Sequence, residues 1–281
     1  MIAKRSLPPA DLRVDVVAVE EILTGFIADE TLRAGMKRVV VGLSGGVDSA
    51  VAACLARRAL GPRGVVAVLM PHRQSHPSSL KDALGLAKRL GLRVERIDIT
   101  PMVEAYFSSD PKASRVRRGN KMARERMSIL YDRSVVHEAL VLGTSNKTEL
   151  LLGYGTIHGD MACSINPIGD LYKTQVRQLA GRLRVPRAIR VKVPTADLWP
   201  GQTDEGDLGY TYERLDGLLI QLVDQRCAPD AAIEAGWPAR MVKQVVERIR
   251  RSQYKRRLPL IAKISERTVG VDFRYPRDWG T

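Results

Sequence analysis

The stretch that decides the fold reads VVVGLSGGVDSA and runs from residue 39 to residue 50. It opens with a short continuous apolar run, Val39 to Leu43, which is typical of a strand buried on both faces of a parallel sheet. The residues from Gly42 to Ala50 then include three glycines, two serines and one aspartate. This composition suits a turn at which the backbone comes close to a phosphate group.

The turn has the form Ser-Gly-Gly-x-Asp-Ser and differs from the Gly-x-x-x-x-Gly-Lys and Gly-x-Gly-x-x-Gly phosphate loops. Gly45 and Gly46 allow a tight turn, and Ser44 and Ser49 add hydroxyl donors. A helix that starts near Asp48 would direct its free N–H groups at the same anion. A carboxylate beside phosphate repels it unless a cation lies between them, so Asp48 is predicted to bind Mg²⁺. The competing interpretation is an ordinary turn between a strand and a helix.

Composition limits the class of protein. The chain has 281 residues, of which 44% are hydrophobic, enough for one large α/β domain or two small ones. No secretory signal and no apolar segment of about 18 residues is visible, which predicts a cytoplasmic protein without a membrane helix. The cysteines Cys54, Cys163 and Cys227 are widely spaced and odd in number, which disfavours a disulfide framework or a Cys-x-x-Cys metal site.

The formal net charge is +14, and basic residues gather in residues 111–126 and 240–281. Such a surplus suggests polyanionic partners, either nucleic acid or small phosphorylated ligands, although each run alone also fits a solvated surface.

Apolar runs and helical periodicities alternate along the first half of the chain, which predicts an α/β fold with a doubly wound, mostly parallel sheet and flanking helices. The expected strands are 38–43, 65–70, 94–99 and 139–143, and the expected helices are 14–27, 50–60, 80–90 and 120–137. Later helices are expected at 172–182, 207–222 and 238–252. Without a linker, residues 1–281 are interpreted as one domain, with a nucleotide-binding core over 14–190 and a lid loop, helices and basic tail over 191–281.

The Ser44–Ser49 hexapeptide resembles the pyrophosphate-binding loop of the N-type ATP pyrophosphatases, whose fold is adenine nucleotide alpha hydrolase-like. Further segments resemble the NAD synthetase family in its short, single-domain form, in family order from about residue 14 to the end. They read GNKMARERM from 119, GTSNKTE from 143, GYGTIHGD from 153, PIGDLYK from 167, KVPTADL from 192, QTDE from 202 and KRRLP from 255.

The resemblance implies ATP-dependent amidation of deamido-NAD by ammonia, through a dinucleotide adenylate, to give NAD, AMP and pyrophosphate. It implies Mg²⁺ as cofactor, held by Asp48 and Glu149, and catalytic roles for Asp48, Asp160 and Lys173. The implied ATP-binding residues are Gly42, Leu43, Ser44, Gly45, Gly46, Val47, Asp48, Ser49, Arg126, Thr144, Lys173 and Thr195. The implied deamido-NAD-binding residues are Arg124, Tyr131, Asp160, Tyr254 and Lys255.

Physical arguments support some of these roles. Glu149 follows a strand end and can supply a second carboxylate beside Asp48, although a solvated helix glutamate fits the same spacing. Thr144 at a strand end can serve ATP or simply cap a helix. Arg124 and Arg126 lie two residues apart on a helix, so they face different directions. Tyr131 can stack on a flat ring or belong to the core.

The chain departs from the family pattern at three places. Many bacterial members have lysine at the position of Ile157, an acidic residue at Ser164, and His-Lys where this chain has Tyr254-Lys255. Dinucleotide contacts at these places are therefore open. His72 and His76, in the loop after the second strand, lack a third metal ligand and are interpreted as plain loop residues.

Residues 72–79 and 196–209 are rich in glycine, proline and polar residues, and we expect both to be mobile and to close over ATP as lids. The resemblance also implies a homodimer, and ammonia as nitrogen donor unless a separate glutaminase chain delivers it. Two alternatives stay open: a tRNA-modifying adenylating enzyme with the same loop, and a nucleotide-binding protein without catalysis. The absence of a zinc or cluster motif makes a nucleic-acid partner the weaker prediction.

Overall fold

The computed structural model describes residues 11–272 and contains a four-stranded sheet in which every neighbouring pair is parallel. The strand order is β3-β2-β1-β4, so the chain reverses its direction of winding beside β1. The strands are β1 Arg38–Gly42, β2 Val65–Leu69, β3 Arg93–Arg96 and β4 Ala139–Leu142. The expected α/β fold with a parallel sheet and flanking helices is confirmed.

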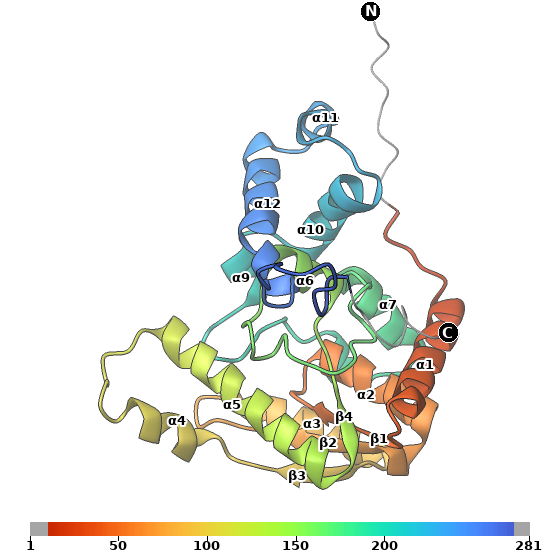
Figure 1. Ribbon diagram of the computed structural model, residues 1–281, viewed down its shortest axis with the longest axis vertical. Helices are drawn as coiled ribbons and strands as arrows, with labels where there is room; N and C mark the ends of the chain where they lie inside the picture. Colours follow the sequence, from red (N-terminus) through yellow and green to blue (C-terminus); the bar gives the residue numbers. More distant parts are fainter. Residues whose placement is uncertain (1–10, 273–281) are drawn as a thin grey trace, which may run out of the picture.

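Alternating side chains of the central strands enter two separate hydrophobic clusters, as strand geometry requires. Val39 and Val41 pack with α1 Val16–Arg33, α2 Val47–Leu60, α3 Pro77–Leu90 and α7 Lys173–Arg182 on one face. Val40 packs on the other face with α4 Thr100–Phe107 and α5 Arg115–Val136 (Figure 1). Because both faces are covered, β2 is buried along its whole length, and β1 is buried at its three central valines.

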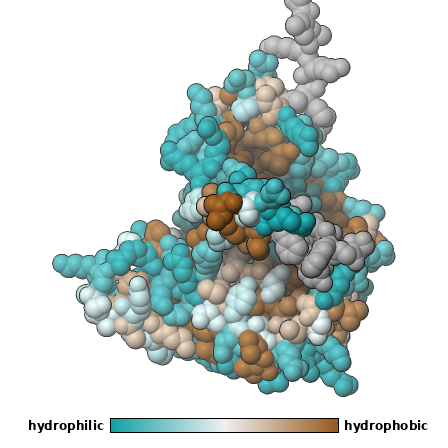
Figure 2. Space-filling model, viewed as in Figure 1, coloured by the Kyte–Doolittle hydropathy of each residue, from teal (hydrophilic) through white to brown (hydrophobic). Residues whose placement is uncertain are grey.

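A third hydrophobic cluster lies beyond the sheet and forms a helical cap, defined here as α10, α11 and α12 with the short helix α6 (Figure 1). Its helices are α6 Lys147–Leu152, α10 Tyr212–Leu219, α11 Pro229–Glu234 and α12 Ala239–Arg251. Figure 2 shows hydrophobic residues between α10 and α12, with hydrophilic residues on the outer surface of the cap. The cap therefore has its own hydrophobic core, and it packs against the sheet and its flanking helices through α6 and α7.

Several element boundaries differ from the sequence predictions. Helix α1 continues to Arg33, and α4 was not expected. The helix expected over 207–222 is divided into α9 Asp204–Leu208, α10, and a π-type turn Ile220–Asp224. Gly209, with a φ of 83°, ends α9 in a left-handed conformation that glycine adopts without strain.

The two expected lid segments are more structured than predicted. Residues 77–79 already belong to α3, and His72 and Ser79 are buried, whereas Arg73, Gln74 and His76 are exposed. The segment 196–209 includes α9. Its neighbour Lys192 donates to the hydroxyl of Ser79 at 3.0 Å. Among residues 11–272, every helix is too short or too polar to cross a lipid bilayer.

Candidate active site

The Ser44–Ser49 turn lies between β1 and α2, at the carboxyl edge of the sheet where parallel α/β folds place their ligands. Gly46 is the N-cap of α2 and supplies no side-chain cap, so the first N–H groups of that helix face the turn. The hydroxyls of Ser44 and Ser49 lie 3.0 Å apart across it. This arrangement of N–H and hydroxyl donors suits a bound anion.

A cavity of about 500 Å³ opens beside the turn. Its walls come from the turn itself, the end of β2, the inner side of α5, the loop after β4, and residues 189–207. Cavities of this size are typical of small-molecule sites. Segments far apart in the sequence thus converge on one chamber.

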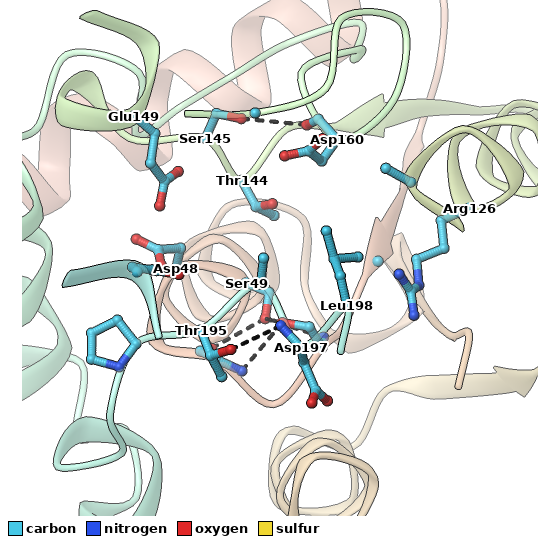
Figure 3. Close-up of a pocket in the computed structure, with 18 of the residues that line it drawn as sticks. Asp48, Ser49, Arg126, Thr144, Ser145, Glu149, Asp160, Thr195, Asp197 and Leu198 are labelled. Atoms are coloured by element: carbon cyan, nitrogen blue, oxygen red, sulfur yellow. Dashed lines mark hydrogen bonds between the residues drawn. The ribbon is translucent and has the colours of Figure 1, made fainter. Parts of the chain in front are cut away.

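Three charged groups meet at one end of the cavity. The Lys173 ammonium donates to Asp48 Oδ2 and lies 3.5 Å from Glu149 Oε1. Figure 3 shows the carboxyl groups of Asp48 and Glu149 pointing toward each other across this end of the cavity. Only 3% of the Lys173 side chain is exposed, so the two carboxylates compensate a charge that has lost its water.

Asn146, which was not predicted from sequence, fixes both carboxylates. Its side-chain amide donates to Asp48 Oδ1 at 3.0 Å. Its side-chain oxygen Oδ1 accepts from the Glu149 backbone N–H at 3.0 Å, and Glu149 Oε2 accepts from the Asn146 backbone N–H at 3.2 Å. Together these two bonds form a capping box at the start of α6. The Asn-x-x-Glu spacing is a known helix-start signal and could have identified this residue.

With both carboxylates ionised, the cluster has one more negative than positive charge, which suits a divalent cation. Burial and the neighbouring Asp48 raise the pKa of Glu149 to about 8. Burial opposes the Lys173 charge, but Asp48 and Glu149 outweigh it and raise the pKa of Lys173. Carboxylate oxygens are donors that Mg²⁺ prefers, so Asp48 and Glu149 fit this ion. Within the part of the chain that the structure describes, no group of three or more His, Cys, Asp or Glu side chains is arranged as a metal site.

Arg126, Thr144, Asp160 and Thr195 also line the cavity (Figure 3). Arg126 Nε donates to the Met70 carbonyl at 3.1 Å, which points the guanidinium along the end of β2. Asp160 Oδ1 accepts from the Thr156 N–H at 2.7 Å, within the glycine-rich loop.

Lys255 also lines the cavity and holds that same loop from the other side. Its ammonium donates to the carbonyls of Gly153 at 2.9 Å and Gly155 at 2.8 Å. The loop carrying Asp160 is therefore tied to the turn Gln253–Arg256, which follows α12.

Three predicted site residues lie elsewhere in the described range. Arg124 is exposed, and its Nε donates to the Ile157 carbonyl at 3.3 Å. Tyr131 lies on α5 with 38% of its surface exposed. Tyr254 lines a second, shallower groove together with Ile157. The structure thus places two of the three departures from the family pattern side by side.

Asp204 is a further carboxylate of the cavity that was not predicted. It is buried at the start of α9 and accepts from the hydroxyls of Tyr154 and Tyr212, each at 3.0 Å. Its N–H donates at 3.0 Å to the carbonyl of Pro194, which also lines the cavity. It falls within the QTDE segment that resembles the family, although that segment alone does not separate it from Glu205.

A bare turn at a helix N-terminus, beside paired carboxylates at the carboxyl edge of a parallel sheet, defines a nucleotide-phosphate-binding α/β protein. Comparison with known proteins narrows this class. A family model described as NAD synthase matches residues 19–259, and the chain belongs to that family. An NH(3)-dependent NAD(+) synthetase from Trichlorobacter lovleyi is 52% identical over 269 residues, which are 96% of this chain and 98% of the relative. One from Chlorobaculum parvum is 52% identical over 97% of this chain and 99% of the relative.

Solved structures agree with this assignment. NMN synthetase from Francisella tularensis is 33% identical, with a TM-score of 0.79, over 89% of this chain and 99% of its own. The NH3-dependent NAD synthetase from Campylobacter jejuni, in complex with the nitrate ion, is 35% identical, with a TM-score of 0.76, over 89% of this chain and 100% of its own. Glutamine-dependent NAD+ synthetase from Acinetobacter baumannii is 27% identical, with a TM-score of 0.67; the match spans 96% of this chain but 51% of that one.

Proposed function

We propose that this protein catalyses the ATP-dependent amidation of deamido-NAD by ammonia, which yields NAD, AMP and pyrophosphate. Family membership and relatives named NH(3)-dependent NAD(+) synthetase support the reaction. The observation that carries the proposal is the joining of the phosphate turn, the Asp48–Lys173–Glu149 cluster and Asp160 in one cavity.

ATP would bind with its β- and γ-phosphates against the turn, where the N–H groups and hydroxyls described above converge. The proposed ATP residues are those of the turn and its approach, with Arg126, Thr144, Lys173 and Thr195, all of which except Gly45 line the cavity. Gly45 would act through its backbone, since it shapes the turn.

Asp48 and Glu149 would hold Mg²⁺, which neutralises charge on the leaving pyrophosphate when bound. Lys173 contacts both carboxylates, so its ammonium must shift when the ion enters. The flexible stem of lysine allows this movement, and the phosphates are the nearest anions that would receive the displaced charge.

The dinucleotide would enter from the opposite side, toward Asp160, Lys255 and the groove that holds Tyr254, with Arg124 and Tyr131 on the outer side of α5. Asp160 would lie near the carboxylate that is amidated and would pair with incoming ammonia. The departures at Ile157, Ser164 and Tyr254 give this subsite a less charged surface than a lysine and an acidic residue would provide.

The reaction needs two steps in this arrangement. A carboxylate oxygen of deamido-NAD attacks the α-phosphorus, an O–P bond forms, and the bridging P–O bond breaks to release pyrophosphate. Ammonia nitrogen then attacks the acyl carbon, the C–O bond to AMP breaks, and one proton leaves the nitrogen. The chain's residues contribute positioning and charge neutralisation, without a covalent enzyme intermediate.

We further propose that the core over 14–190 and the segment 191–281 act as one catalytic unit, and that the protein works as a homodimer. Residues 72–79 and 196–209 would close over ATP, as the hydrogen bond from the His76 N–H to Asp197 already joins the two segments at 3.0 Å. Closure would protect the adenylate from water.

The test is an assay with Mg·ATP, ammonium and either deamido-NAD or nicotinate mononucleotide, with NAD, AMP and pyrophosphate measured separately. We expect the three products in equal amounts, and a kcat/KM for the mononucleotide at least about tenfold lower, because half of the dinucleotide contacts are missing. Preferred amidation of the mononucleotide would instead favour the substrate indicated by the name of the Francisella tularensis protein. AMP transfer to tRNA without NAD formation would favour a tRNA-modifying enzyme.

A further inference from the structure

Asp216 of α10 is a fully buried carboxylate within the helical cap, and it does not line the cavity. Its Oδ1 accepts from the Thr148 hydroxyl at 2.6 Å, and its Oδ2 accepts from the Thr174 N–H at 2.8 Å. Both carboxylate oxygens are therefore acceptors, as an ionised group requires in a buried place. Burying a carboxyl group within a hydrophobic cluster costs free energy, so the presence of Asp216 at this place calls for an explanation.

Each partner of Asp216 is the sequence neighbour of a charged site residue. Thr148 precedes Glu149 in the first turn of α6, and Thr174 follows Lys173 in the first turn of α7. The Thr148 hydroxyl also accepts from the Lys173 N–H at 3.0 Å. The Thr148 hydroxyl donates its single proton to Asp216, while a lone pair of the same oxygen accepts from the Lys173 N–H.

These three hydrogen bonds join the N-termini of two helices that each carry one side of the charged cluster. A carboxylate at a helix N-terminus is also favoured by the helix dipole, and here one carboxylate serves two such ends. A small rotation of α6 relative to α7 would change the separation of Glu149 and Lys173. The network opposes that rotation.

We propose that Asp216 is a positioning residue that fixes Glu149 relative to Lys173, through Thr148 and Thr174, and thereby sets the affinity for Mg·ATP. The inference rests on the proposed function, since it assigns the Asp48–Lys173–Glu149 cluster to the nucleotide phosphates. It gives the helical cap a part in ATP binding, because through this network α10 holds the first turns of both α6 and α7, in addition to the contacts of its Tyr212 with Lys173 and Asp204.

The experiment compares Thr148→Val, which keeps the shape but removes the hydroxyl, with Thr148→Ser, which keeps the hydroxyl, and with Asp216→Asn. Thr31→Val is the matched control, because the buried Thr31 hydroxyl donates to the Ile27 carbonyl at 2.6 Å within α1, outside the cavity. Calorimetry measures the Kd of Mg·ATP and of deamido-NAD separately, and thermal unfolding measures stability.

We expect Thr148→Val and Asp216→Asn to raise the Kd of Mg·ATP about tenfold or more, as losses of supporting hydrogen bonds around a metal site do. Thr148→Ser should restore it, and the Kd of deamido-NAD should change less than about twofold, well under 1 kcal/mol by the tenfold-per-1.4 rule. If both variants unfold at lower temperature but bind Mg·ATP like Thr31→Val, Asp216 supports only the fold and the inference is wrong. Should Asp216→Asn not fold, the Thr148 pair decides. Wild-type protein that binds Mg·ATP but forms no NAD would remove the proposed function and leave this test intact.

Discussion

Lys173 shows how a single residue links burial to function. Its ammonium has almost no contact with solvent, and the nearby carboxylates of Asp48 and Glu149 stabilise its positive charge. The same two carboxylates would bind the metal ion, so Lys173 and Mg²⁺ would share the oxygens of Asp48 and Glu149. This sharing makes the charge balance at the site sensitive to single substitutions.

Asp48→Ala is expected to lower kcat/KM more than about a hundredfold, because it removes a metal ligand and leaves Lys173 with one carboxylate partner fewer. The fold should persist, since Asp48 lies at the cavity surface and outside the hydrophobic clusters. Steady-state kinetics and circular dichroism check both points. Asp230→Ala, at an exposed position that starts α11, is the control and should keep full activity. A folded Asp48→Ala enzyme with wild-type turnover would contradict the metal role.

Cys54 gives a prediction about pH. Burial within α2 raises the pKa of its thiol from 9.0 to about 11. The folded state therefore holds this proton more tightly than the unfolded state, and stability should fall as pH rises from about 9 to about 11, by up to about 3 kcal/mol. Cys54→Ala lacks this contribution, so its stability deficit relative to wild type should shrink between about pH 8 and pH 10.5. Urea unfolding under reducing conditions measures the deficit; a constant value would refute the assignment.

At the scale of elements, the phosphate turn depends on backbone geometry that few residues adopt. Gly45 has a φ of 81°, and a Cβ there would lie 2.3 Å from the Ser79 carbonyl oxygen at the start of α3. The turn and α3 are thus in direct backbone contact, and the position admits only glycine.

Gly45→Ala should destabilise the protein by about 1–3 kcal/mol and abolish detectable ATP binding, because either the turn or α3 must move. Gly85→Ala is the matched control: Gly85 lies in the same helix α3, is exposed, and has open space where a Cβ would lie. That substitution should leave ATP binding unchanged and stabilise the helix by up to about 1 kcal/mol. Denaturant unfolding measures the stability of both variants, and calorimetry measures their binding of Mg·ATP. If Gly45→Ala binds Mg·ATP as well as Gly85→Ala does, the steric argument is wrong.

The sequence was most informative where one physical effect dominates. The buried strands β1 and β2 are continuous apolar runs, and their prediction was confirmed. Strand β3 lies at the sheet edge, its residues are mostly exposed, and its predicted end at residue 99 was three residues too long. The predicted helix over 207–222 was right for α10 and the turn after it but wrong about its start, because apolar periodicity continues across Gly209, where the backbone turns.

The site divides in the same way. Glycines, serines and Asp48 form a local pattern, so the phosphate turn was accessible from the sequence alone. Asp204 and Asp216 act through partners 8 to 68 positions away, and the sequence around them, QTDE included, does not indicate those partners. Long-range partners of buried carboxylates are a property of the fold, which local patterns do not contain.

At the scale of the whole molecule, charge and architecture agree with the proposed substrates. ATP, deamido-NAD and the pyrophosphate product are anions, and the chain has a net charge of +14. The sheet with its flanking helices supplies the phosphate turn, the cap supplies Asp216, and the turn that follows α12 supplies Lys255. The cavity lies where these parts meet.

The nitrogen source follows from the same architecture. This chain matches 51% of the length of the glutamine-dependent enzyme from Acinetobacter baumannii, whereas it matches 98% of the ammonia-dependent relative from Trichlorobacter lovleyi. Releasing ammonia from glutamine requires an activated nucleophile, usually a cysteine of lowered pKa. Here burial raises the pKa of both Cys54 and Cys163 instead.

We therefore expect NAD formation with ammonium chloride, and a rate with glutamine at least about a hundredfold lower at equal nitrogen concentration. The assay follows NAD by a coupled dehydrogenase, with glutamine freed of ammonium beforehand. Cys227→Ser serves as the control for the remaining thiol, and it should leave both rates unchanged. Efficient use of purified glutamine by this chain alone would mean that a nucleophile within it performs the hydrolysis, and the amide donor would have to be reassigned. If glutamine becomes effective only after a separate glutaminase is added, the synthetase site uses ammonia however that ammonia is produced.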